Sequence, residues 1–163
     1  MRCGMILGIC VLILCVTSRV PAQTDAGNAV YVPVTTFDSS RDAATDIRSA
    51  VVEAERTGRR VLLDVGGNWC VWCRRLDAMF ISNTELASTR DKYFVTVKVN
   101  YSPANKNEAL LSRYPKIPGY PHLFVLEKDG KLLQSQSTGD FESGKGYDPS
   151  RIMAFLNKWA PKK

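Results

Sequence analysis

The stretch "VLLDVGGNWCVWC", residues 61–73, decides the fold, because an apolar run leads directly into two cysteines spaced as Cys-x-x-Cys. Residues 61–65 are continuously apolar except for one carboxylate, Asp64, which is typical of a central strand covered on both faces. Two glycines end that run, and a helical pattern begins at Cys70. The sequence therefore places Cys70 and Cys73 where a strand passes into a helix.

This position suits thiol chemistry. At the start of a helix, unpaired backbone amides and the helix dipole favour a thiolate over a thiol, so Cys70 is the predicted nucleophile. Cys73 lies one turn further on, where it can attack a mixed disulfide on Cys70 and release the partner protein. A bridge across so short a loop removes little chain entropy, so a purely structural disulfide is not favoured.

The first 22 residues have the pattern of a secretory signal peptide. A basic residue, Arg2, precedes an apolar run over residues 5–16, which is shorter than the roughly 20 residues that span a bilayer. We expect cleavage before Gln23 and secretion across an inner membrane into a periplasm, with an uncleaved anchor as the alternative. Cleavage would also remove three of the five cysteines, namely Cys3, Cys10 and Cys15.

Metal and haem sites are not predicted. A structural zinc site needs about four ligands, but the mature chain would offer only Cys70, Cys73 and His122. Covalent haem attachment requires a histidine directly after Cys73, where Arg74 stands instead. We therefore expect no metal and no cofactor other than a redox-active Cys70–Cys73 disulfide.

Charge and length describe an ordinary globular domain. The 163 residues suit one domain, and the formal net charge of +6 falls to +4 once Arg2 and Arg19 are removed. The remaining lysines and arginines form no block, so nucleic acid is not an expected partner.

The rest of the chain alternates strand and helix patterns. We expect a leader and first strand over residues 23–41 and one domain over residues 42–163. Within the domain we expect helices over 42–56, 70–80, 104–113 and from 149 onward, and strands over 61–65, 93–99, 122–126 and 131–135. This order predicts an α/β fold with a central mixed β-sheet flanked by helices on both faces. Residues 139–148 are expected to form a solvated connection, with a part in partner recognition as the alternative.

Two charges interrupt otherwise apolar strands. An unpaired Asp64 would be costly in a buried strand, unless the strand is bent or hydrated there. The functional interpretation is that Asp64 lies beneath the cysteines and exchanges protons with Cys73, aided by a pKa that burial raises. Lys98 interrupts the next apolar strand and could pair with Asp64.

These features occur together in a familiar order. The segments "VLLDV", "WCVWC", "VKVN", "GYPHLFVL" and "KDGK" resemble the thioredoxin pattern along nearly all of the mature chain. The segments "GNWC" and "ISNTEL" are most similar to the C-terminal reductase domain of the membrane protein DsbD and to small exported thioredoxin-like proteins. The resemblance implies a thioredoxin fold and thiol-disulfide oxidoreductase activity.

The resemblance also implies roles for individual residues. Cys70 corresponds to the attacking cysteine and Cys73 to the resolving cysteine. Asp64 corresponds to the buried carboxylate of the family, and Lys98 to its lysine partner.

Substrate-binding positions follow in the same way. Pro121 corresponds to the proline that follows a cis peptide bond and faces the cysteines. The backbone of Tyr120 then pairs with an extended client chain as an added strand. Trp69 corresponds to the tryptophan that flanks the active site, and Trp72 adds a bulky apolar wall.

The sequence departs from the family pattern at several positions. Gly66 and Gly67 stand where thioredoxins usually have an aromatic and a small residue, which predicts a more open floor to the site. Trp72 supplies no positive charge, so the thiolate should be less stabilised than in strongly oxidising relatives. His122 replaces a threonine, and both a structural role and tuning of Cys70 are open.

The function expected is therefore reduction of disulfides in client proteins by an exported monomer. A membrane thiol reductase of the DsbD type is the expected electron donor. Two alternatives remain: a disulfide oxidase or isomerase with the same chemistry, and a non-catalytic adaptor that binds peptides in the Tyr120–Pro121 groove.

Overall fold

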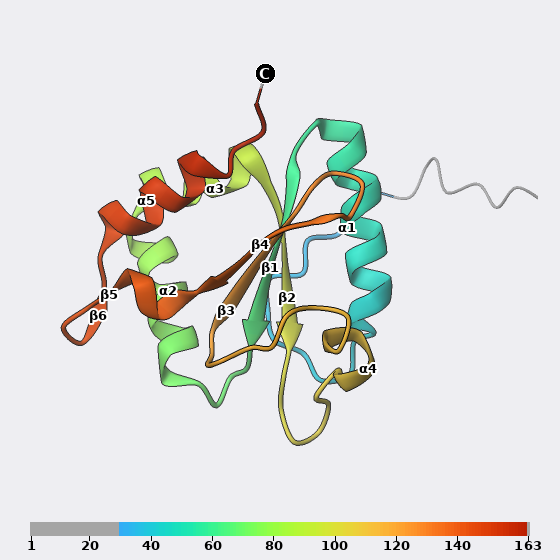
Figure 1. The fold of residues 1–163 in the computed structure, drawn as a ribbon, viewed down its shortest axis with the longest axis horizontal. Coiled ribbons are helices and arrows are strands. Elements are labelled where there is room, and N and C mark those ends of the chain that lie inside the picture. Colours follow the sequence, from blue (N-terminus) through green and yellow to red (C-terminus); the bar gives the residue numbers. More distant parts are fainter. Residues whose placement is uncertain (1–29, 163) are drawn as a thin grey trace, which may run out of the picture. The chain divides into compact units, whose positions relative to one another are not determined.

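The computed structural model describes residues 30–162, and its centre is a four-stranded mixed sheet in the order β2-β1-β3-β4 (Figure 1). The strands are β1 (Arg60–Gly66), β2 (Phe94–Asn100), β3 (His122–Leu126) and β4 (Leu132–Ser137). β1 runs parallel to β2 and antiparallel to β3, while β3 and β4 form a hairpin. The mixed sheet expected from the sequence is confirmed.

Helices cover both faces of this sheet, as expected (Figure 1). The helices are α1 (Ala43–Thr57), α2 (Val71–Ser82), α3 (Thr84–Tyr93), α4 (Glu108–Leu111) and α5 (Pro149–Lys158). Alternate residues of β1 point to opposite faces, so Leu63 and Val65 pack in the core beneath α1. Leu62 points the other way, into the core formed with α2, α3 and α5.

Side-chain caps begin the helices where the sequence predicts them. The carboxylate of Asp42 accepts the backbone N–H of Ala44 at the start of α1, and Gly58 ends that helix in the left-handed conformation. Asp148 caps α5 in the same way, with Pro149 in its first turn.

Of the first strand expected within residues 23–41, the described residues show a single bridge, between Val34 and Val97. Pro33 has no backbone N–H to extend the ladder. This bridge includes the hydrogen bond from the backbone N–H of Lys98 to the carbonyl of Val34 at 3.1 Å, which holds the segment against β2.

Two helices differ from expectation. α3 was not expected; it begins where the side chain of Asn83 accepts the N–H of Leu86. The helix expected over residues 104–113 shrinks to the short α4. Asn107 adopts a left-handed conformation before α4, and its side-chain amide donates to the carbonyl of Asn100, which holds the preceding residues in a loop.

The solvated connection expected at residues 139–148 is found only in part, because its polar residues are largely exposed but the segment also carries regular structure and two buried aromatic residues. This segment contains most of a 3₁₀ helix, Thr138–Phe141, and the small hairpin β5 (Glu142–Ser143) and β6 (Gly146–Tyr147). Phe141 and Tyr147 are buried in the core, because their aromatic side chains gain more from burial than from exposure.

The signal peptide expected at residues 1–22 lies outside the described residues. Among residues 30–162, no helix has the length and apolar content that crossing a bilayer requires.

Candidate redox site

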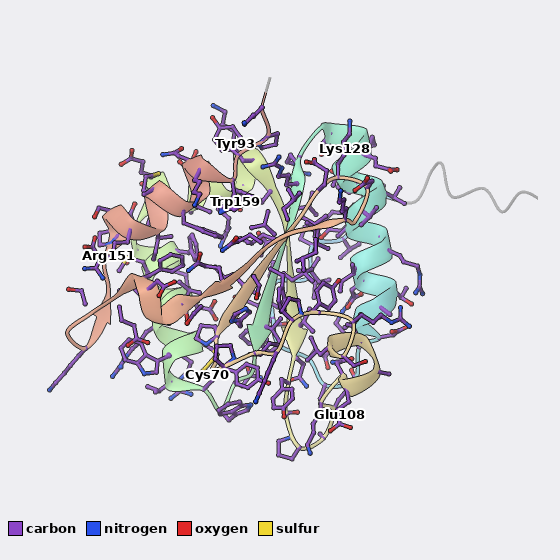
Figure 2. The ribbon with its side chains drawn as sticks, in the orientation of Figure 1. Cys70, Tyr93, Glu108, Lys128, Arg151 and Trp159 are labelled. Carbon is purple, nitrogen blue, oxygen red and sulfur yellow. A yellow bond between two sulfur atoms is a disulfide. The ribbon has the colours of Figure 1, made fainter. Side chains whose placement is uncertain are left out.

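Cys70 lies at the end of the sheet where the parallel strands β1 and β2 end (Figure 2). It is the N-cap of α2, and its Sγ accepts the backbone N–H of Cys73 at 3.1 Å. The two cysteines form a disulfide, with Cα atoms 5.2 Å apart. The cap directs the positive end of the α2 dipole at the Cys70 sulfur, which favours a thiolate there after reduction.

The loop before β3 faces the same sulfur. The Tyr120–Pro121 peptide bond is cis, and the carbonyl oxygen of Tyr120 lies 3.4 Å from the Cys70 Sγ. On the other side of the proline, the hydroxyl of Thr138 donates to the carbonyl of Pro121 at 2.7 Å. The backbone of Tyr120 is thus held directly beside the predicted nucleophile.

A set of aromatic side chains borders the disulfide on one side. The indole N–H of Trp69 donates to the carbonyl of Tyr101 at 2.6 Å, although the Trp69 side chain is exposed. The ring of Tyr101 stacks on Tyr120 at a centroid distance of 4.6 Å. Burial, with Tyr101 as a neighbour, raises the pKa of Tyr120 to about 12, so its phenol stays neutral. These contacts hold an exposed aromatic surface in place next to Cys70.

Trp72 also packs against the disulfide. Its ring meets Tyr147 edge-on at 5.3 Å, and the hydroxyl of Tyr147 donates to the carbonyl of Trp72 at 3.4 Å. The guanidinium of Arg75 lies 4.4 Å from the centre of the Trp72 ring. Trp72 itself carries no charge, but its ring holds the Arg75 guanidinium near the site. The residue type at position 72 alone does not predict this cation.

Asp64 and Lys98 are opposite each other in the β1–β2 register, and they form an ion pair at 3.0 Å. The register of β1 is unbroken and Asp64 is buried, so this carboxylate lies within a regular, covered part of the strand. Lys98 also contacts Asp77 at 2.5 Å, and Asp77 lies one turn after Cys73 on α2. The ion-pair network therefore connects the sheet to the helix that carries the cysteines.

Lys98 pairs with two carboxylates, those of Asp64 and Asp77, and this arrangement bears on the pKa of Asp64. Desolvation raises the pKa of Asp64, and Lys98 only partly offsets this effect. The Oδ1 atom of Asp64 has no hydrogen-bond partner among residues 30–162. Burial opposes the charge of Lys98, but the two carboxylates outweigh it and raise the pKa of Lys98. Burial therefore favours the protonated form of Asp64.

The floor of the site is closed, contrary to the expectation from Gly66 and Gly67. Phe37, from the segment before α1, packs with Cys70 and Cys73 in one buried cluster. A Cβ atom on Gly66 would lie 2.5 Å from the Cys73 Sγ, and one on Gly67 would lie 2.5 Å from the indole nitrogen of Trp69. Both glycines therefore allow close packing of neighbouring side chains.

His122 is buried, and its Nε2 lies 2.8 Å from the hydroxyl of Ser135. Its ring lies 4.8 Å from the ring of Phe124, whose side chain belongs to the core beneath α1. Burial lowers the pKa of His122, and its Nδ1 has no hydrogen-bond partner in the described part of the chain. These contacts favour the structural interpretation of His122.

The structure joins the two predicted cysteines in a disulfide, places four of the other predicted residues near it, and places the remaining two in the adjoining ion-pair network: Trp69, Trp72, Tyr120 and Pro121, and Asp64 and Lys98. Sequence reasoning missed Asp77 and Phe37. Asp77 could have been found from its spacing of four residues after Cys73, which places both on one helix face. Within residues 30–162, no group of three or more His, Cys, Asp or Glu side chains is arranged to hold a metal ion.

A mixed sheet between helices, with a Cys-x-x-Cys disulfide at a helix start beside a cis-proline, defines a redox protein with the thioredoxin fold. The family model described as thioredoxin-like matches residues 42–128. The chain belongs to this thioredoxin-like family.

Known relatives are thiol-disulfide proteins. The chain is 30% identical over 135 residues to the thiol:disulfide interchange protein DsbD of Pseudomonas fluorescens, a match that covers 78% of this chain and 21% of that protein. It is 27% identical over 105 residues to the disulfide bond reductase DsbH of Chlamydia pneumoniae, covering 60% of this chain and 57% of that protein. The matched region thus spans only about a fifth of DsbD and little more than half of DsbH.

A solved structure agrees with this relationship. A protein from Xylella fastidiosa, described as a disulphide isomerase, superposes with a TM-score of 0.66 and 29% sequence identity. The match covers 75% of this chain and 94% of that one.

Proposed function

We propose that this protein is exported and reduces disulfide bonds in client proteins, with Cys70 forming the mixed disulfide and Cys73 resolving it. Its chemical class is that of a thioredoxin-fold thiol-disulfide oxidoreductase of the Dsb type, in agreement with its family and relatives. The observation that carries the proposal is the position of the Cys70 Sγ, which lies between the N–H of Cys73 and the carbonyl of Tyr120.

Reduction takes two exchange steps. In the first, the Cys70 thiolate attacks a client disulfide: a Cys70–client bond forms, the client S–S bond breaks, and one client sulfur leaves as a thiolate. In the second, Cys73 loses its proton and attacks the Cys70 sulfur, forming the Cys70–Cys73 bond and releasing the second client thiolate. The client disulfide gains two electrons, which the two enzyme thiols supply.

Asp64 is the proposed acceptor of the Cys73 proton. Its free Oδ1 and its raised pKa support this role, and water can carry the proton between the two groups. The enzyme disulfide must then be reduced by another dithiol, and we propose a membrane thiol reductase of the DsbD type for that step.

Client binding is proposed at the groove beside the cis-proline. An extended client segment would hydrogen-bond to the backbone of Tyr120 and rest against the exposed ring of Trp69. Trp72 would form the other wall. No positive residue lies between the two cysteines, which supports a reductase over a strong oxidase.

Three measurements test this proposal. The wild-type protein should reduce insulin when a dithiol regenerates it, and the Cys70–Cys73 pair should have a reduction potential near the roughly −270 mV of thioredoxin. Cys73→Ala should accumulate mixed disulfides that Cys70→Ala does not form. A potential near the roughly −120 mV of strong oxidants would exclude the reductase role, and a Cys73→Ala variant that traps nothing would favour the adaptor.

Disulfide isomerisation is a second candidate, favoured by the similarity to the Xylella protein. Recovery of activity from ribonuclease with scrambled disulfides would support it if the wild-type protein does not reduce insulin. Export is tested separately: the protein should occur in a periplasmic extract with Gln23 as its N-terminal residue.

A further inference from the structure

We propose that Phe37 is a positioning residue of the redox site, and that its ring sets the equilibrium between the Cys70–Cys73 disulfide and the two thiols. The inference deepens the proposed function and rests on it, because it concerns the same cysteine pair. It assigns a role to the segment before α1, where the sequence indicates only a leader and a strand.

The Phe37 ring touches both parts of the site. Its side chain is only 6% exposed and packs with Cys70 and Cys73. The ammonium group of Lys98 lies 4.2 Å from the centre of the same ring. This distance allows a cation–π interaction, which restrains the Lys98 side chain as it binds the two carboxylates.

The backbone around Phe37 is fixed from two directions. The carbonyl of Val34 accepts the N–H of Lys98 in β2, and the carbonyl of Phe37 accepts the side-chain amide of Asn68 at 3.1 Å. Asn68 lies two residues before Cys70. One bond thus ties the segment to the strand that carries Lys98, and the other ties it to the loop that carries the nucleophile.

Gly66 makes the space that the ring and the sulfur share. A Cβ atom there would lie 2.5 Å from the Cys73 Sγ and 3.2 Å from Cζ of Phe37. Strand, sulfur and ring therefore fit together only because position 66 has no side chain. An aromatic group brought in from a distant segment closes the floor of the site.

Loss of the ring should favour the dithiol in two ways. Water would reach Cys73 and stabilise its thiolate, which exists only in the reduced protein. Cys73 and Lys98 would also be less restrained, so Cys73 would close on Cys70 less readily. Both effects make the disulfide less stable relative to the two thiols.

Equilibration with glutathione tests this inference. In that exchange the Cys70–Cys73 bond breaks, a glutathione disulfide forms, and two protons pass from two glutathione thiols to the cysteines. For Phe37→Ala we expect the equilibrium to shift about tenfold toward the dithiol, which corresponds to about 30 mV. The control is Phe155→Ala, because Phe155 is also 6% exposed but lies in a core cluster that contains neither cysteine.

The control should leave the equilibrium within about twofold of wild type. A Phe37→Ala equilibrium within that range, or an equal shift in Phe155→Ala, would overturn the inference. If Phe37→Ala does not fold, Phe37→Leu replaces it: the loss of the ring face toward Lys98 should give a shift of about threefold, and an unchanged equilibrium would count against the role of the ring. The equilibrium can be measured even if the wild type fails to reduce insulin, so the two proposals fail separately.

Discussion

Replacing Gly66 with alanine should destabilise the oxidised protein. The loss should be larger than for the same replacement at Gly146, the other described glycine on a strand. The new Cβ would lie 2.5 Å from the Cys73 Sγ, well inside contact distance. The end of the Phe37 ring, at 3.2 Å, can move by a few tenths of an ångström. The Cys73 sulfur cannot move so easily, because the disulfide and the start of α2 both hold it.

The expected cost follows from overpacking. Forcing an extra methyl group into a filled core typically costs about 1–3 kcal/mol, and we take about 2 kcal/mol here. For a domain of this size that corresponds to a fall in Tm of about 5–10 °C. The fall should be smaller in the reduced protein, because a free Cys73 side chain can rotate away from the new methyl group.

Thermal unfolding followed by circular dichroism measures this difference in the oxidised and reduced forms. Gly146→Ala in β6 is the matched control, since a Cβ atom there meets no atom within 4 Å. Equal Tm values for Gly66→Ala and Gly146→Ala in the oxidised form would refute the close packing of Gly66, Cys73 and Phe37.

Three further outcomes are expected. Because burial raises the pKa of Asp64, its ionisation opposes folding above its unfolded pKa of about 3.9. Asp64→Asn should therefore raise the unfolding free energy in urea at pH 7 but not at pH 3, and slow insulin reduction on the order of 10²-fold. Burial lowers the pKa of His122, so the contribution of this residue to stability is complete above about pH 6.5 and is lost as the pH falls. The unfolding free energy should therefore fall less between pH 7 and pH 5 in His122→Gln than in the wild type. Trp69→Ala should lower kcat/KM for insulin about tenfold with little change in Tm, because the Trp69 side chain is exposed beside Cys70.

The local sequence pattern is sufficient to predict most of the sheet and the position of the cysteine pair. The apolar run before Cys70 predicts β1, and a second apolar run predicts β2. One charge interrupts each run, and the parallel register sets Asp64 directly opposite Lys98. Each charge alone is a weak signal in the sequence, but the pairing of the two strands brings them together as an ion pair. The Asp64–Lys98 part of the site could therefore be predicted.

Contacts between distant segments were not accessible in the same way. Phe37 is flanked by polar residues, so its burial depends on Gly66 and Cys73, more than 25 residues away in the chain. The helix α3 buries only Leu86 and therefore has no apolar periodicity to reveal it. A position is hard to predict when the partner that buries it is defined only by tertiary packing.

The position of Phe37 also bears on which residues a chimeric protein must take from this chain. The match to the family model starts at residue 42, which is also where the sequence pattern places the domain boundary. A chimera grafted from that residue onward would keep both cysteines, Asp64 and Lys98, yet it would leave the ring at the floor of the site behind. A boundary drawn at residue 42 would therefore separate Phe37 from the cysteines that it packs against, and exchanges between relatives should include the ten or so residues before α1.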